Sequence, residues 1–116
     1  MSKAAPLRLT SAMFEILLSL GGEALHGYAI MKEIEERTGG EVALGPTTLY
    51  RSLKELLRHG YIEEGEKTDD PDADSRRRTY RLTQSGREAA ARRAAALASS
   101  LEAARRMGLR PQEGAP

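Results

Sequence analysis

The stretch GPTTLYRSLKELLRHGYIEE, residues 45–64, contains a short helix with two chemically distinct faces. Pro46 suits the first position of a helix, where its missing N–H costs little, and Gly60 suits the end. At about 100° per residue, one side of this helix collects apolar side chains that can pack on a core; these are Leu49, Leu53, Leu56 and Leu57. The opposite side carries hydroxyls and cations, which are Thr47, Arg51, Lys54 and Arg58, with Tyr50 at one edge and Thr48 near the other.

Two further helices are predicted before this one. The first covers residues 10–20, with Thr10 as its N-cap and a broad apolar stripe formed by Met13, Phe14, Leu17, Leu18 and Leu20. The second covers residues 28–38, with Ile30, Met31 and Ile34 turned inward and Lys32, Glu33, Glu35 and Glu36 turned outward. Paired glycines follow each segment and indicate where it ends.

The remainder of the chain predicts a β-hairpin and a long helix. The β-like runs YIEEGEK and RRRTYRLT are separated by TDDPDADS, whose Asp and Pro residues predict a loop. Thr83 is suited to cap an alanine-rich helix that follows. We therefore predict a mainly α fold with a small β-hairpin, a winged helix-turn-helix with an appended helix. Its parts are an N-terminal arm (1–9), a winged-helix DNA-binding domain (10–82), a C-terminal dimerisation helix (83–107) and a flexible tail (108–116).

The polar face of the helix after Gly45 is typical of a recognition helix. In a helix-turn-helix, the second helix enters the major groove and its N-terminal residues reach base edges. Arginine can bond guanine bidentately, and threonine can offer its hydroxyl to a base or its methyl to thymine. Lys54 and Arg58 lie further along, where we expect phosphate contacts. A helix face that carries cations only for solubility would show the same pattern.

The second strand of the predicted hairpin is rich in arginine, at Arg76, Arg77, Arg78 and Arg81. Strand alternation places Tyr80 and Leu82 together on one face, which leaves the other face for the sugar-phosphate backbone. The alternative is that these arginines pair with the acids of the loop, Asp69, Asp70, Asp72 and Asp74. Phosphates would repel four carboxylates, so we assign DNA contact to the arginines and not to the loop tip.

The composition of the chain limits the classes of function that it can have. The formal net charge is only +1, but residues 76–110 hold ten arginines against two glutamates, a concentration suited to a polyanion. The absence of cysteine excludes disulfides and thiolate zinc sites. His26 and His59 have no accompanying ligand set or nucleophile motif, so we expect structural roles for them, no metal, no cofactor and no enzymatic activity. The N-terminus lacks the apolar stretch of a signal peptide, and no apolar run approaches the ~20 residues of a membrane span, which favours a cytoplasmic protein.

The segment LHGYAIMKEIEERTGGEVALGPTTLYRSLKELLRHGYIEE, followed by RRRTYRLTQSGR, closely resembles the PadR family of bacterial transcriptional regulators. The motifs HGY, PTTLYRSL, GYIE and YRLTQSGR carry the resemblance, which covers nearly all of residues 10–87. It implies a winged-helix DNA-binding domain, a homodimer built by the C-terminal helix, and repression relieved by a small molecule. By position, the residues that match the family's recognition helix are Thr47, Thr48, Tyr50, Arg51 and Lys54, and those that match its wing are Arg76, Arg77 and Arg78.

The chain departs from this family pattern in two places. The acidic insertion TDDPDAD makes an unusual wing tip, and the absence of tryptophan removes the aromatic clamp that some drug-binding members use. The single terminal helix resembles the short branch of the family. Tyr28, near the start of the second helix, could donate to a phosphate or belong to the core, and the sequence leaves both roles open.

The final helix has a coiled-coil-like seam of apolar residues at alternating spacings of four and three: Ala90, Ala94, Leu97, Leu101 and Ala104. This seam predicts a homodimer, although the helix could instead lie back on the first helix. Both hold if the first helix, including Met13 and Phe14, has more apolar surface than one small core covers. A cavity between two protomers would then be the natural site for a small-molecule effector of unknown identity.

The predicted partners are thus a palindromic DNA operator, a second copy of the chain and an effector, with no membrane. The rival interpretation is a winged-helix module that uses the same basic face to bind an acidic protein. Salt-dependent binding to duplex DNA with a preference for a palindrome would distinguish the two.

Overall fold

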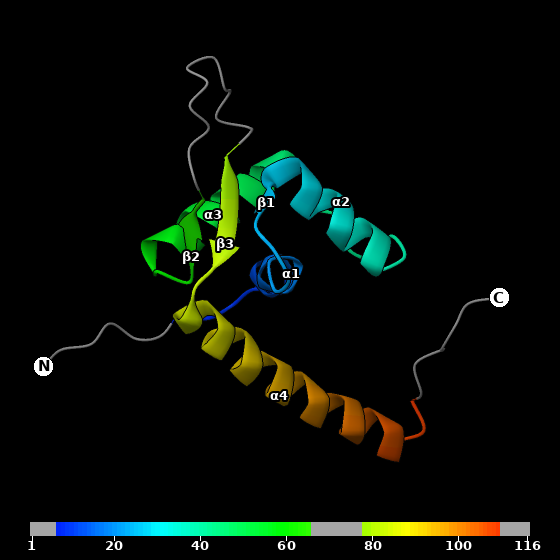
Figure 1. Cartoon of the computed structure of the whole chain (residues 1–116). Coiled ribbons are helices and arrows are strands. Elements are labelled where there is room, and N and C mark those ends of the chain that lie inside the picture. The colour runs from blue at the N-terminus through cyan, green and yellow to red at the C-terminus, as the bar shows by residue number, and fades with distance from the viewer. Residues whose placement is uncertain (1–6, 66–77, 110–116) are drawn as a thin grey trace, which may run out of the picture.

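The computed structural model describes residues 7–65 and 78–109 of the 116-residue chain. The elements follow in the order α1 (Ser11–Ser19), β1 (Leu25–His26), α2 (Gly27–Arg37), α3 (Pro46–Arg58), β2 (Ile62–Glu64), β3 (Thr79–Leu82) and α4 (Gln84–Arg106). Figure 1 shows α1, α2, α3 and the small sheet grouped into one body, with α4 running away from it below α1. The mainly α fold with a small β-hairpin, the winged helix-turn-helix and the long final helix are confirmed.

The core lies where α1, α2 and α3 meet. Three of the four leucines predicted for the inward face of α3 are buried, with Leu49, Leu53 and Leu56 at most 1% exposed, and Leu57 is half-buried against the same core. It packs in one cluster with apolar residues of the other two helices, which are Met13, Ile16, Leu17, Leu20, Ile30 and Ile34. One member of the predicted α1 stripe differs, because Leu18 is 42% exposed.

The sheet has three antiparallel strands in the order β1-β3-β2. Strand β3 is central: Ile62 of β2 pairs with Leu82 on one side, and Leu25 of β1 pairs with Tyr80 on the other. Tyr80 is buried, in agreement with the predicted alternation. Strand β1 was not predicted, because two residues are too few to show a period of two.

A polar network joins α1 to α2. It includes Glu33, whose side chain we predicted to turn outward and which instead bonds to α1. The Ser19 hydroxyl donates to Glu33 Oε1 at 2.6 Å, and Arg37 Nε donates to Glu33 Oε2 at 2.8 Å. Arg37 Nη1 also donates to Glu15 Oε1 of α1 at 2.7 Å. Hydrogen bonding to the Arg37 guanidinium lowers the pKa of Glu33, so the carboxylate stays charged and the two helices stay linked near neutral pH.

Thr83 ties the start of α4 to the end of α3. Its hydroxyl accepts from the Gly86 N–H at 3.0 Å, which caps α4, and donates to the Gly60 carbonyl at 2.6 Å. Its N–H donates to the Tyr61 carbonyl at 3.2 Å. Gly86 is buried, and a Cβ at this position would overlap the Tyr61 carbonyl. The first turn of α4 can therefore approach the main chain of residues 60–61 this closely only with glycine here.

We predict that Gly86→Ala destabilises the protein although alanine is the better helix former. Helix propensity would favour alanine by about 0.5–1 kcal/mol, but overpacking against main chain that cannot rotate away costs about 1–3 kcal/mol or more. Urea unfolding followed by circular dichroism measures the difference. Gly22→Ala is the matched control, because a Cβ there meets nothing within 4 Å. Equal unfolding midpoints for the two variants would contradict the close packing of α4 on Tyr61.

Candidate nucleic-acid interface

The outward face of α3 is exposed and free of internal bonds in the part of the chain that the structure describes. Thr47, Thr48, Arg51 and Lys54 are all exposed, and none of their side chains forms a hydrogen bond or ion pair with another described residue. Arg58, at the last turn, makes a long contact of 3.5 Å with Glu55. The two faces predicted for this helix are therefore present, and the polar one is available to a partner.

The N-terminus of α3 adds to this face. Its N-cap is Gly45, so no side chain satisfies the first N–H groups of the helix. Acidic residues are absent from the first turn. A helix N-terminus of this kind favours an anion such as phosphate, because its N–H groups and dipole point outward.

Tyr50 holds a fixed place at the edge of the α3 face. It is 37% exposed, and its hydroxyl lies over the start of α2, where a Cβ on Gly27 would be 2.7 Å away. Any residue larger than glycine at position 27 would therefore force the Tyr50 side chain to move. Tyr28 next to it is 65% exposed, which rules out the core role left open by the sequence. Its contact with phosphate stays a prediction.

The described part of the wing carries its cations in ion pairs with the neighbouring strand. Arg78 Nη1 lies 3.0 Å from Glu64 Oε1, and Arg81 Nε lies 2.8 Å from Glu63 Oε1. The sequence suggested the loop acids as internal partners and missed the two glutamates of β2. Exposed pairs such as these contribute about 1 kcal/mol or less, so the arginines can exchange partners readily. Arg76 and Arg77, and the loop acids Asp69, Asp70, Asp72 and Asp74, lie outside the described residues.

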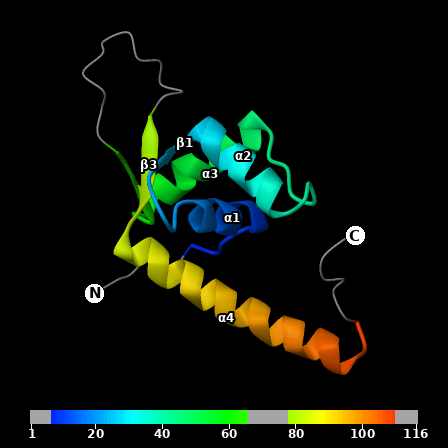
Figure 2. The ribbon, with the colours of Figure 1, turned by 45° about the vertical axis from the view of Figure 1, so that its right-hand side comes forward.

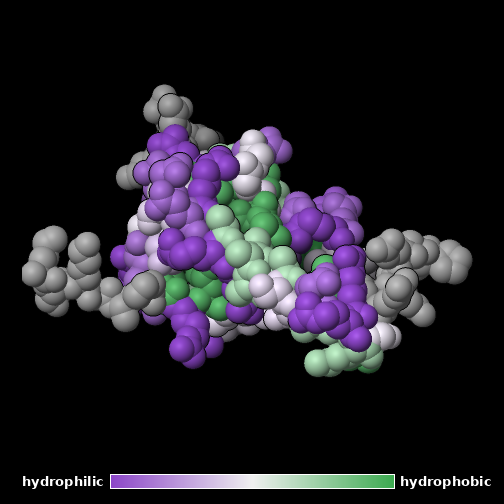
Figure 3. Space-filling model, turned by 90° about the horizontal axis from the view of Figure 1, so that it is seen from below, coloured by the Kyte–Doolittle hydropathy of each residue, from purple (hydrophilic) through white to green (hydrophobic). Residues whose placement is uncertain are grey.

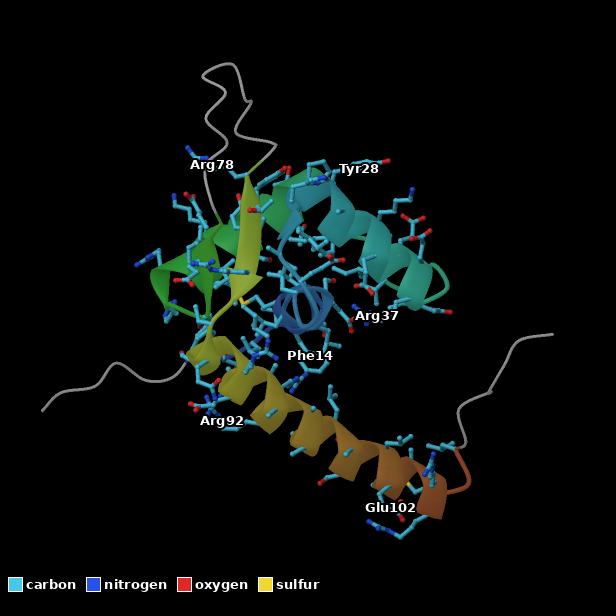
Figure 4. All side chains as sticks on the ribbon, viewed as in Figure 1. Phe14, Tyr28, Arg37, Arg78, Arg92 and Glu102 are labelled. Atoms are coloured by element: carbon cyan, nitrogen blue, oxygen red, sulfur yellow. The ribbon has the colours of Figure 1, made fainter. Side chains whose placement is uncertain are left out.

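These groups lie on one side of the molecule. Figure 4 places Tyr28 and Arg78 together at one edge of the body, whereas Arg92 and Glu102 of α4 lie at the opposite edge. Figure 2 agrees for the start of α2, which lies on the side of the body away from α4, whereas β3 runs from that side down to the start of α4. The start of α2 and the base of the wing at Arg78 thus lie on the side of the body away from the long helix.

Both histidines have structural roles, as predicted. His26 is the N-cap of α2, where its Nδ1 accepts from the Ala29 N–H at 3.3 Å. His59 is the C-cap of α3, and its Nδ1 lies 3.0 Å from the Glu55 carbonyl oxygen. Across residues 7–65 and 78–109, no group of three or more His, Cys, Asp or Glu could hold a metal ion. In the same ranges, no helix is long and apolar enough to cross a membrane.

A family model described as the transcriptional regulator PadR-like family matches residues 16–92. The matched region includes all of α2, α3 and the three strands. The chain belongs to the PadR-like family. It is a transcriptional regulator and not an enzyme, which confirms both the resemblance and the function class predicted from the sequence. We found no match among curated proteins.

Solved structures of similar proteins share the fold of this chain. RosR of H. salinarum is 33% identical over 80% of this chain and 77% of its own, with a TM-score of 0.61. Bacillus subtilis PadR, solved in complex with operator DNA, is 26% identical over 67% of this chain and 44% of its own, with a TM-score of 0.58. A PadR family regulator of Clostridium difficile R20291, 21% identical with a TM-score of 0.71, shares the fold over 84% of this chain and 98% of its own.

In this PadR-like chain, the body of the protein covers only the first turns of the long helix α4. Gly86 and Ala89 are buried, while Leu97 and Leu101 are each 39% exposed. Of the predicted seam, Ala90 and Ala104 are half-buried, and Ala94 is exposed. Figure 3 shows the result from below: a band of apolar surface crosses this face between hydrophilic patches.

The two α1 residues assigned to the dimer interface lie inside the single chain. Met13 is 8% exposed and Phe14 is 7% exposed, so each has little surface left for a partner. The exposed apolar side chain of the same helix is Leu18, another member of the broad apolar stripe predicted for this helix. The contribution of Met13 and Phe14 to a dimer stays a prediction, and their direct share of any interface is small.

Proposed function

We propose that the chain is a homodimeric, sequence-specific DNA-binding repressor that acts in the cytoplasm and releases its operator when a small molecule binds. The observation that carries the DNA part is the α3 face, where hydroxyls and cations are exposed and unbonded among the described residues. Buried leucines hold the opposite face rigidly on the core. A PadR relative solved with operator DNA supports the same use of the fold.

In this proposal, the residues divide by role. Thr47, Thr48, Tyr50 and Arg51, in the first turns of α3, read base edges in the major groove. Lys54 and Arg58 lie further along and contact phosphates, as do Tyr28 and the wing arginines Arg76, Arg77 and Arg78. Because Arg78 is paired with Glu64, its phosphate contact requires that the ion pair opens.

The dimer part of the proposal is supported by the uncovered stripe of α4. At about 100° per residue, Leu97, Leu101 and Ala104 lie on the same side of the helix as Gly86 and Ala89, which the body of the chain buries. The stripe therefore continues beyond the body of its own chain. A second copy would cover it, and the two-fold symmetric pair would present two α3 helices to a palindromic operator. The effector would then bind between the protomers and change the distance between those helices.

We expect Arg51→Ala to weaken binding to the operator by about 1–3 kcal/mol and to relax the preference at one base position, because a bidentate contact to a base is lost. Lys54→Ala, which changes the same charge one turn later, should weaken binding to operator and to random duplex alike. Fluorescence anisotropy on both duplexes measures the difference. If Arg51→Ala lowers the two affinities equally, Arg51 is a phosphate contact.

Arg78→Ala should weaken binding to every duplex and reduce the slope of log affinity against log salt by about 1. The reason is that the variant makes one phosphate contact fewer and therefore releases fewer counterions on binding. Glu64→Gln should have the opposite effect, since it frees Arg78 from its ion pair. Both variants are assayed across a salt titration on a random duplex. An unchanged slope for Arg78→Ala would remove the wing base from the DNA interface.

Leu101→Asp should abolish tight operator binding while the α3 face stays intact. Two ionised carboxylates in the proposed seam would lose hydration without a partner and repel each other, which costs several kcal/mol. Each monomer would then fill one half-site without the gain from linkage. Light scattering gives the molar mass, and anisotropy gives the operator affinity.

Ala95→Asp is the matched control for this experiment. Ala95 lies on the opposite, exposed side of α4 and receives the same charge. It should remain dimeric and bind the operator tightly. If Leu101→Asp is also folded, dimeric and tight, the seam lies elsewhere; if it is monomeric and still tight, the mechanism with two half-sites is wrong.

A further inference from the structure

One side of α2 forms a surface groove of about 690 Å³ with the segment that leads into α3. Its apolar part is formed by Tyr28, Met31 and Leu44, and its charged part by Lys32, Glu35 and Glu36. At about 100° per residue, the α2 members of this set share one side of the helix. Two consecutive parts of the helix-turn-helix thus build a groove, which we call the α2 groove.

The α2 groove is acidic, although the neighbouring helix α3 is basic. Residues 27–45 hold four glutamates against one lysine and one arginine, whereas α3 holds one glutamate against three cations. Glu35 and Glu36 are exposed, and neither forms an ion pair with another described residue. Lys32 balances only one of these two charges. The groove therefore has a net negative charge and carboxylates that can accept from a cationic partner.

Neither folding nor DNA explains these two acids. Glu35 and Glu36 lie in the last turn of α2, where the helix dipole favours cations and disfavours carboxylates. The phosphates of a duplex on the nearby face of α3 would repel them. Charge for solubility alone would be supplied equally well by lysine or arginine, which the dipole favours at this end. A cation from a bound partner would offset both unfavourable effects.

The apolar part of the groove favours a protein segment over a simple cation. Met31 and Leu44 are half-buried, and Tyr28 is 65% exposed, so a large apolar side chain can rest against all three. Methionine adapts its shape to such a side chain, and the tyrosine ring adds apolar area. A basic segment with one apolar anchor would use both parts of the groove.

The α2 groove lies at the border of the proposed DNA face. Tyr28 belongs to both, and Leu44 directly precedes Gly45, the N-cap of α3. Figure 4 shows Tyr28 at the edge of the body on the same side as Arg78. A protein bound to adjacent DNA would meet this border, and such proteins carry lysine and arginine where they approach the duplex. Its charge would therefore be complementary to that of the groove.

We propose that the α2 groove docks a basic segment, with one large apolar side chain as its anchor, of a protein bound to the DNA beside this chain. Cations of the segment pair with Glu35 and Glu36, and the anchor rests on Met31 and Leu44 beside the ring of Tyr28. The contact couples the two proteins, so each raises the occupancy of the other on the duplex. The coupling on DNA rests on the proposed function, whereas the affinity of the groove for such a segment does not.

The probe is a short fluorescein-labelled peptide in which arginine and leucine alternate. Binding to the whole chain, without DNA, is followed by fluorescence anisotropy at low salt. Two matched peptides separate charge from anchor: serine replaces leucine in one, and glutamine replaces arginine in the other. We expect the arginine-leucine peptide to bind about tenfold more tightly than either, since each of these lacks one half of the contact.

The double variant Glu35→Gln, Glu36→Gln should bind the peptide about fivefold more weakly or worse, because two exposed ion pairs are lost. Unfolding would not account for this loss, since the removal of two acids from the last turn of α2 favours the helix. Thermal unfolding should show a variant at least as stable as the wild type. The matched control is Glu23→Gln, Glu102→Gln, which removes the same charge at exposed positions outside the groove and should bind the peptide as the wild type does.

Several results would overturn the proposal. Equal affinities for the arginine-leucine and arginine-serine peptides would leave no role for the anchor, and an equal loss in the control variant would leave no role for the groove. A groove variant less stable than the wild type would mean that the two acids support the fold. Displacement of the peptide by an equal concentration of spermidine would mean that the groove takes a small cation. A changed molar mass of the groove variant in light scattering would mean that a second copy of the chain occupies it.

The position on DNA is tested with the same peptide tethered to one end of a duplex that the chain binds. The tether should raise the affinity of the wild type for this duplex about tenfold or more, because the second contact becomes intramolecular, and it should have no effect on the groove variant. If the chain binds no duplex, the proposed function fails while the free peptide still decides the groove. If the free peptide binds and no tether length raises the affinity, a neighbour on DNA does not reach the groove and the proposal is wrong.

Discussion

The hydroxyl of Thr83 makes two hydrogen bonds at once, and the direction of α4 depends on them. One bond caps α4 through Gly86, and the other holds the carbonyl of Gly60 at the end of α3. The Tyr61 carbonyl, which accepts from the Thr83 N–H, fills the space where a Cβ of Gly86 would lie. The long helix therefore leaves the body at a fixed angle to α3. Any motion of α4 at its base is transmitted to the end of α3 through a few covalent and hydrogen bonds.

Helix α1 is the second shared support. It packs on α2, α3 and α4, and it contributes Glu15 and Ser19 to the network around Arg37. Its apolar side chains fill the core, so little apolar surface of α1 is left for a partner. This explains why Met13 and Phe14 are buried in a single chain and why only Leu18 of the apolar stripe stays exposed. A small domain whose core depends on α1 cannot use the same α1 side chains fully for both the core and a partner.

The local features of the fold could be predicted from the sequence. Thr10 and Thr83 cap their helices, Pro46 begins α3, and the leucine face of α3 is buried, because each depends on nearby residues or on a clear period. Features that depend on contacts between distant segments could not be predicted. The place of Glu33 depends on Ser19, and that of Tyr50 on Gly27.

The same limit applied to the candidate sites. The outward face of α3 was found from its spacing alone, because one helix holds all its members. The glutamates of β2 that pair with Arg78 and Arg81 were missed, since strand register and not sequence distance brings them together.

The freedom of the α3 face has a consequence for how such a regulator can evolve. Thr47, Thr48, Arg51 and Lys54 contribute nothing to the core and bond to no other described side chain. In the proposed repressor, mutations at Thr47, Thr48 and Arg51 would change which DNA sequence is preferred, and mutations at Lys54 would change the overall affinity, in each case without a loss of folding stability. Tyr50 is different, because its ring lies close to Gly27 at the start of α2 and a change there would also remove this contact. A duplicated gene of such a repressor could therefore acquire a new operator through three positions while the scaffold is inherited unchanged.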